Sequence, residues 1–128
     1  MFVKQIMSAN PITISPDAGI LEAANLMREK KIRRLPVVKG DKVVGIVTEM
    51  DILKVQPSQA TTLSVFEVNY ILAKMKVSDV MAKKLLTVQA EATLEEAALI
   101  MRENEVGGLP VVSGNKLVGV ITESNIFD

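Results

Sequence analysis

The chain of 128 residues is 48% apolar and 23% charged, and its 15 basic and 15 acidic side chains leave no formal net charge at neutral pH. This composition is typical of a globular domain, and it lacks the positive charge expected of a dedicated DNA or RNA binder. Without Cys or His, the chain cannot form disulfides, thiolate nucleophiles, serine–histidine relays or ordinary zinc sites.

Targeting signals are not visible in the sequence. Residues 1–5 lack the charged-then-apolar order of a signal peptide, and no apolar run approaches the roughly 18 residues of a membrane span. We therefore expect a cytoplasmic protein that contacts neither a membrane nor nucleic acid directly.

The first half of the chain predicts a strand followed by a helix. A short run rich in β-branched residues, Ile12–Ile14, predicts the strand. Apolar residues then recur at the spacing of one buried helical face, at Ile20, Ala23, Ala24 and Met27.

Two continuous apolar runs, Leu35–Val38 and Val43–Val47, follow that helix. They flank Gly40-Asp41, and a glycine beside a polar residue is typical of a tight hairpin turn. A short helix over Glu49–Leu53 completes a β-α-β-β-α order.

A polar segment over residues 56–62 predicts a linker. After it, Ser64 and Glu67 have the spacing of a helix capping box, and apolar residues continue at roughly helical spacing as far as Met75. We therefore predict a linker helix.

Residues 77–127 repeat residues 3–53 without a gap, at a constant offset of 74 positions (77 − 3). The copy has its own apolar helical face, a capping box at Thr93 and Glu96, and a Gly114-Asn115 turn. A single repeat buries little surface on its own, so we predict two pseudo-symmetric repeats packed sheet to sheet in an α/β (α+β) fold. The predicted divisions are residues 1–54, 55–76 and 77–128.

The repeats resemble the CBS domain, whose paired arrangement is called a Bateman module. The resemblance lies in Leu35–Val38 with Gly45–Asp51, and in the copies Leu109–Val112 with Gly119–Asn125. It implies a regulatory module without catalytic residues or a catalytic cofactor. Such modules bind adenosine compounds such as AMP, ADP, ATP or S-adenosylmethionine in the cleft between repeats. It also implies a homodimer that signals to a protein effector, whose identity the sequence does not indicate.

The resemblance implies a first pocket built on Thr48 and Asp51, with Asp51 holding the ribose hydroxyls. Ile46 lies in the same segment, and the basic pair Arg33-Arg34 corresponds to the family's phosphate contacts. The adenine is then expected to rest on the second repeat, where the candidate residues are Ala82, Thr87, Val106 and Gly107.

A mirrored pocket is implied around Thr122 and Asn125, with Ser8, Thr13, Ile32 and Arg33 around the base. Here Asn125 replaces the family's usual Asp, and Gly107-Gly108 replaces the arginine pair. Asn offers one acceptor oxygen and no charge, so we expect this second site to be weaker or empty.

Each of these features also has a purely structural interpretation. Thr48 and Asp51 have the spacing of a helix cap, Arg33-Arg34 can be a solvated pair, and Gly45 and Gly119 can serve to let backbones approach closely. Two other functions therefore stay open: a ligand-free dimerisation module, favoured by the altered second repeat, and an enzyme acting on a nucleotide.

Overall fold

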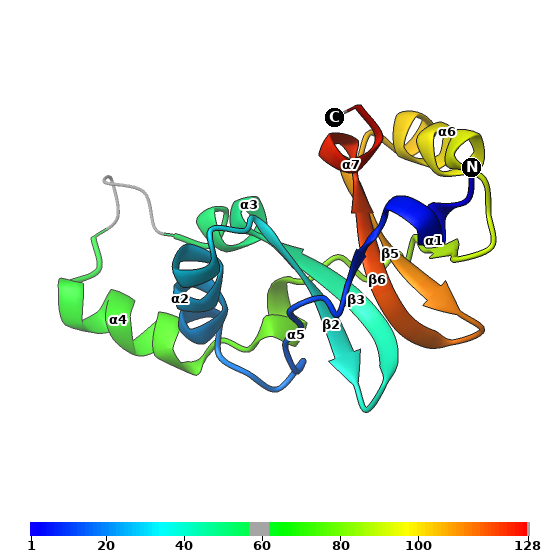
Figure 1. The fold of residues 1–128 in the computed structure, drawn as a ribbon. Coiled ribbons are helices and arrows are strands. Elements are labelled where there is room, and N and C mark those ends of the chain that lie inside the picture. The colour runs from blue at the N-terminus through cyan, green and yellow to red at the C-terminus, as the bar shows by residue number, and fades with distance from the viewer. Residues whose placement is uncertain (57–61, 128) are drawn as a thin grey trace. The chain divides into compact units, whose positions relative to one another are not determined.

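The structure is a computed structural model, and it describes residues 1–56 and 62–127. Its helices are α1 (Val3–Ile6), α2 (Ile20–Lys30), α3 (Glu49–Leu53), α4 (Val65–Lys74), α5 (Val77–Val80), α6 (Leu94–Asn104) and α7 (Glu123–Phe127). Its strands are β1 (Ser8–Ala9), β2 (Arg34–Lys39), β3 (Lys42–Thr48), β4 (Val88–Gln89), β5 (Gly108–Ser113) and β6 (Lys116–Thr122) (Figure 1). The fold is a mixed α+β fold, which confirms the predicted class. No helix in these residues is long and apolar enough to span a membrane.

Contacts divide the chain into two compact units. Unit 1 consists of Met1–Ile12, Gly40–Val43 and Leu85–Asp128, and unit 2 consists of Thr13–Lys39 and Val44–Lys84. The units therefore do not coincide with the repeats along the sequence. Unit 1 contains most of the second repeat together with Met1–Ile12 and Gly40–Val43 of the first, and unit 2 contains most of the first repeat together with residues 77–84 of the second.

In unit 2, helix α2 buries the predicted apolar stripe. Ile20, Ala23 and Met27 are at most 3% exposed, and Ala24 is partly buried. They belong to a core in which α2, α3 and α5 contribute apolar side chains beside the strand residues Leu35, Val37 and Val47. The predicted helical face is confirmed.

Unit 1 repeats this arrangement with the equivalent residues. Helix α6 buries Ala97 and Met101, and strands β5 and β6 bury Leu109, Val111 and Ile121. Strands β5 and β6 pair antiparallel with a register shift between Val111 and Val112, and β4 lies parallel to β5.

We call Met1–Ile12 and residues 77–84 the exchanged segments, since each packs in the unit that holds most of the other repeat. They close the two cores in the same way. In unit 1, the fully buried Val3 donates its backbone N–H to Ala92 O at 2.8 Å. In unit 2, the fully buried Val77 donates to Ala18 O, also at 2.8 Å. Since Val3 and Val77, and likewise Ala18 and Ala92, are 74 positions apart, the two bonds are copies of one another.

The predicted turns and capping boxes are present. Strand β2 ends at Lys39 and β3 begins at Lys42, and Gly40 and its counterpart Gly114 have φ values of 68° and 64°, which glycine adopts without strain. Thr93 and Ser64 accept hydrogen bonds from the backbone N–H groups three residues later, at 3.2 and 3.1 Å.

The strand predicted over Ile12–Ile14 is much shorter in the structure. Only Ile14 pairs, with Val37, and Ile12 and Thr13 form no bridge within the described residues. The chain turns directly after Ile14, where the Ala18 N–H donates to Ser15 O, so the pairing does not continue beyond it. In the copy the strand β4 begins only at Val88. The linker helix is confirmed as α4, whereas residues 57–61 of the predicted linker lie outside the described residues.

Candidate functional site

The junction between β3 and α3 in unit 2 fixes the side chains of Thr48 and Asp51. Thr48 is the residue that caps α3, and its Oγ1 accepts a hydrogen bond from the Asp51 backbone N–H at 3.1 Å. In return, Oδ2 of Asp51 accepts one from the Thr48 backbone N–H at 2.9 Å. The capping interpretation of this motif is therefore confirmed, and the cap holds the carboxylate in one orientation.

The helix cap uses one of the two carboxylate oxygens of Asp51, Oδ2. Within residues 1–56 and 62–127 no protein group donates to its second oxygen, Oδ1, and the residue is half-buried. A carboxylate oxygen held in this way can accept hydrogen bonds from two neighbouring hydroxyls.

Arg33 lies beside this junction. Its backbone carbonyl accepts a hydrogen bond from the Glu49 N–H at 2.9 Å, which ties the segment before β2 to the first turn of α3. The Arg33 side chain is exposed and that of Arg34, at the start of β2, is half-buried. The two guanidinium groups therefore belong to the same unit as Thr48 and Asp51.

On its other side, β3 contacts the segment that follows α5. The Ala82 N–H donates to Ile46 O at 2.9 Å, in an isolated antiparallel bridge. A β-carbon at Gly45 would lie 2.8 Å from Met81 Sδ and 2.9 Å from Ala82 O, so the glycine allows this approach. The prediction that Gly45 permits close backbone contact is confirmed.

Unit 1 contains the copy of this arrangement, at the junction of β6 and α7. Asn125 Oδ1 accepts from the Thr122 backbone N–H at 2.9 Å and from the Thr122 hydroxyl at 3.0 Å. The Glu123 N–H donates to Gly107 O, and Ser8 pairs with Val120 of β6. The acceptor oxygen of Asn125 is thus bonded twice within the protein, whereas Asp51 keeps one oxygen for other donors.

The residues of each predicted pocket are distributed over both units. For the first pocket, unit 2 holds Thr48, Asp51, Arg33, Arg34, Ile46 and Ala82, while Thr87, Val106 and Gly107 belong to unit 1. For the mirrored pocket, unit 1 holds Ser8, Thr122 and Asn125, while Thr13, Ile32 and Arg33 belong to unit 2. The ligand contacts assigned to all of these residues remain predictions.

Two basic residues near the site were missed from the sequence. Lys83 and Lys84 directly follow Ala82 and are exposed. A comparison of the two repeats could have indicated them, because these lysines stand where the first repeat has the uncharged residues Ala9 and Asn10.

Known proteins are similar to this chain over nearly its whole length. An inosine-5'-monophosphate dehydrogenase of Korarchaeum cryptofilum is 38% identical over 117 residues, which are 91% of this chain but 21% of the dehydrogenase. The chain spans between about a fifth and a third of the length of such curated relatives.

Two solved structures are similar in fold and were determined with ligands. CBSX2 in complex with AMP is 28% identical, with a TM-score of 0.82 over 98% of this chain and 93% of that one. The CBS domain pair of MJ0100, in complex with 5'-methylthioadenosine and S-adenosyl-L-methionine, is also 28% identical. Its TM-score is 0.80, over 99% of this chain and 93% of that one.

The family model of the CBS domain matches twice, at residues 3–58 and 77–128. These two matches contain the Thr48–Asp51 junction and its copy at Thr122–Asn125, which the structure builds in the same way. The resemblance inferred from the sequence motifs is therefore confirmed. The chain belongs to the CBS domain family and carries a pair of CBS domains.

Proposed function

We propose that this chain is a regulatory module that binds an adenosine-containing ligand at Thr48 and Asp51 of unit 2. The observation that carries the proposal is the Asp51 carboxylate, which is oriented by the cap through Oδ2 and retains Oδ1 as an acceptor. The 2' and 3' hydroxyls of a ribose are a pair of neighbouring donors that suits such an oxygen. The AMP complex of CBSX2 and the adenosine-ligand complex of MJ0100 support the same ligand class.

The charge around Asp51 favours a ligand that carries phosphate. Arg33, Arg34, Lys83 and Lys84 all belong to unit 2, and guanidinium groups form strong paired hydrogen bonds with phosphate oxygens. We therefore rank AMP, ADP and ATP before S-adenosylmethionine, whose sulfonium group is positively charged.

The equivalent position in unit 1 is proposed as the weaker site. The Asn125 oxygen is already bonded to both the N–H and the hydroxyl of Thr122, and Gly107 and Gly108 provide no side-chain donors. A ligand there would have fewer charged partners and would have to compete for the amide oxygen.

The proposed output is a change in conformation that a protein partner in the cytoplasm detects, and not a chemical reaction. A ligand shifts an equilibrium between conformations only by its difference in affinity for them, so occupancy of unit 2 becomes the signal. The dehydrogenase activity of the Korarchaeum relative is not transferred, because this chain spans only 21% of that protein. We further propose that the module is a homodimer.

A second candidate is a dimerisation module without a small ligand. Large apolar side chains remain exposed on the short helices α3 and α7, where Leu53 is 52% and Phe127 is 78% exposed. Large exposed apolar groups are typical of protein–protein contacts when they gather on a surface. This function would not require Asp51 to keep a free oxygen.

Calorimetric titration of nucleotide-free protein with AMP, ADP, ATP and S-adenosylmethionine tests the proposal. We expect saturable binding of at least one phosphate-bearing ligand, and its loss in Asp51→Ala. Because Asp51→Ala also removes a helix cap, Thr93→Ala serves as the matched control: it removes a similar cap from α6, away from Thr48 and Thr122 along the chain. No binding by any of the four compounds would reject the proposal in favour of the ligand-free module.

A further inference from the structure

Helix α4, which connects the two CBS domains, is the most apolar of the longer helices. Seven of its ten residues are apolar and two are charged, whereas α2 and α6 each contain four charged residues among eleven. It lies between the two segments that match the family model, residues 3–58 and 77–128, so the CBS fold itself does not account for this composition. A helix that is apolar on all sides is normally covered on all sides.

Unit 2 covers one side of α4. The helix packs against α2 (Figure 1), and Leu72 is 7% exposed while Val68 and Met75 are half-buried. Its C-terminal end is fixed as well, because Met75 O accepts a hydrogen bond from the Ile20 N–H at 3.1 Å. Helix α4 is therefore attached to unit 2 along one side and at one end.

The opposite side of α4 carries two aromatic side chains. Since successive residues of a helix are about 100° apart, Phe66 and Tyr70 lie one turn apart and roughly opposite Leu72. They are 86% and 62% exposed, and Val65 and Ile71 of the same helix are 74% and 47% exposed. Exposed apolar residues that stand singly are ordinary, but four large ones on one short helix form a patch.

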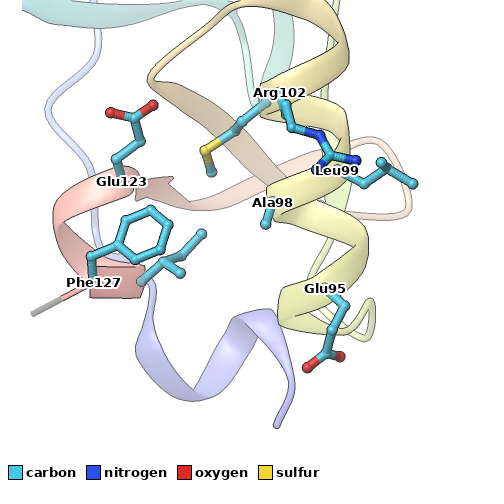
Figure 2. Close-up of a pocket in the computed structure, with 8 residues that line it drawn as sticks. Glu95, Ala98, Leu99, Arg102, Glu123 and Phe127 are labelled. Carbon is cyan, nitrogen blue, oxygen red and sulfur yellow. The ribbon is translucent and has the colours of Figure 1, made fainter.

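The exposed ring of Phe127 in unit 1 differs from the two rings of α4. Phe127 is 78% exposed, yet it lines a groove of about 600 Å³ beside α6. Figure 2 shows its ring directed toward α6, on the side where Ala98 lies. Phe66 and Tyr70 instead lie on the side of their helix away from its buried residues. Covering them therefore requires a surface from outside unit 2.

The two charged side chains of α4 flank this aromatic pair. Glu67 and Lys74 are seven residues apart, about two turns, so they lie on the same side of the helix as Tyr70. Glu67 belongs to the capping box of α4, in which its Oε1 accepts from the Ser64 N–H at 3.3 Å. Lys74 Nζ donates to the Tyr70 hydroxyl and lies 4.3 Å from the centre of the ring. Both charges are thus held beside the aromatic surface.

This arrangement of charges is complementary to a second α4 that runs in the opposite direction. When Tyr70 lies opposite Ile71 at the midpoint, Glu67 of each helix faces Lys74 of the other, because both pairs are centred between residues 70 and 71. A parallel pair would place each charge opposite its own copy, which repulsion disfavours. The dipoles of two antiparallel helices also attract each other.

We propose that α4 packs antiparallel against α4 of a second copy of this chain, with Phe66 and Tyr70 in the contact and a Glu67–Lys74 ion pair at each end. One two-fold axis generates this contact, so it joins two copies and does not grow into a filament. The inference rests on the self-association proposed above and assigns to it a surface separate from α3 and α7. A membrane is a poorer match, because helices that lie on membranes are rich in lysine and arginine, and α4 contains one lysine.

Cross-linking tests the position of the contact. The chain has no cysteine, so Ala73→Cys introduces a sole thiol on the exposed side of α4 and keeps both rings and both charges. With a short bismaleimide we expect this variant to link to itself at least about tenfold more than Lys39→Cys, at the exposed end of β2, because a fixed contact raises the effective concentration of the thiols. Light scattering on the wild type separates the two proposals. A monomer would overturn the self-association as a whole, whereas an oligomer in which Ala73→Cys links no better than Lys39→Cys would overturn the α4 contact alone.

Charge exchange tests the two ion pairs. Glu67→Lys and Lys74→Glu, each combined with Ala73→Cys, place like charges opposite each other when a variant meets its own copy. We expect cross-linking of each variant alone to fall about tenfold and to recover between the two when they are mixed, because mixing restores opposite charges at both ends. Asp41→Lys, which reverses an exposed acid in the turn between β2 and β3, is the matched control and should not change cross-linking. Circular dichroism verifies that each variant keeps the helix content of the wild type. Unchanged cross-linking in the folded single variants, or no recovery on mixing, would overturn the proposal.

Discussion

A β-carbon added to Gly45 would lie 2.9 Å from the backbone carbonyl oxygen of Ala82, closer than β-carbons approach in real structures. Ala82 also donates its N–H to Ile46 O, so strand β3 and the segment after α5 lie in direct backbone contact. The same relationship recurs between Gly119 and Ser8, where the distance is 2.8 Å. In both units, a missing side chain allows a segment from the other repeat to approach the strand that leads into the capped junction.

Replacing Gly45 by Ala should therefore destabilise the protein. Relief of the overlap requires movement of the Ala82 backbone, and we expect the free energy of unfolding to fall by about 1–3 kcal/mol in urea denaturation. Gly19→Ala is the matched control, since its nearest neighbour would be Met75 O at an ordinary 3.8 Å. Equal stability of the two variants would show that the close approach is not restrictive.

Replacing Gly19 by Thr should stabilise the protein. Gly19 caps α2 without a side-chain hydrogen bond, whereas the equivalent Thr93 forms a capping box with Glu96. Glu22 already stands at the matching position, and the backbone at Gly19, with φ −74° and ψ 153°, suits a threonine. We expect a gain of roughly 0.5–1 kcal/mol over wild type in urea denaturation. If Gly19→Thr is no more stable than Gly19→Ala, the hydroxyl does not cap the helix.

The Asp51→Asn variant separates ligand binding from folding. Asn125 forms the equivalent cap through its Oδ1 at 2.9 Å, so an amide at position 51 should leave the unfolding free energy within about 1 kcal/mol of wild type. Loss of the charged acceptor should nevertheless weaken nucleotide binding by about tenfold or more, as expected for a hydrogen bond to a charged group. Calorimetry and urea denaturation measure the two effects, and unchanged affinity would exclude Asp51 from the binding site.

Arg33→Ala and Arg34→Ala test for phosphate contact. Both should lower the affinity for AMP more than that for 5'-methylthioadenosine, because the second compound has no phosphate to pair with a guanidinium group. Arg28→Ala, an exposed position in α2, provides the control for a general loss of positive charge. Parallel losses for both ligands in calorimetric titration would assign the arginines a role unrelated to phosphate.

The features predicted correctly from the sequence are those that depend on neighbouring residues. The capping boxes at Ser64 and Thr93 need only a spacing of three residues, and the turn at Gly40 needs a glycine between two apolar runs. The pairing of Thr48 with Asp51 is local in the same sense. Such interactions form within one or two turns of the chain, so the sequence pattern is sufficient to find them.

The exchange of segments between the repeats could not be predicted in this way. Val3 and Val77 occupy the same position in their repeats. The sequence around each of them is therefore compatible with packing against the helix and strands of either repeat. The four-residue helices α1 and α5 are too short to show a helical period. For the candidate site, the approach of Ala82 to Ile46 depends on this exchange, which is why Lys83 and Lys84 were not recognised.

The exchanged segments also determine how the chain can fold. Neither half of the sequence contains a complete core: the first half lacks Val77 for unit 2, and the second half lacks Val3 for unit 1. Closing unit 1 requires the buried Val3 to reach Ala92, where an ion pair also joins Lys4 and Glu91, 87 residues apart. Contacts of such high sequence separation are expected to form slowly. Once formed, the two halves should stay associated even if the peptide chain is cut between the repeats, because each half completes the interior of the other.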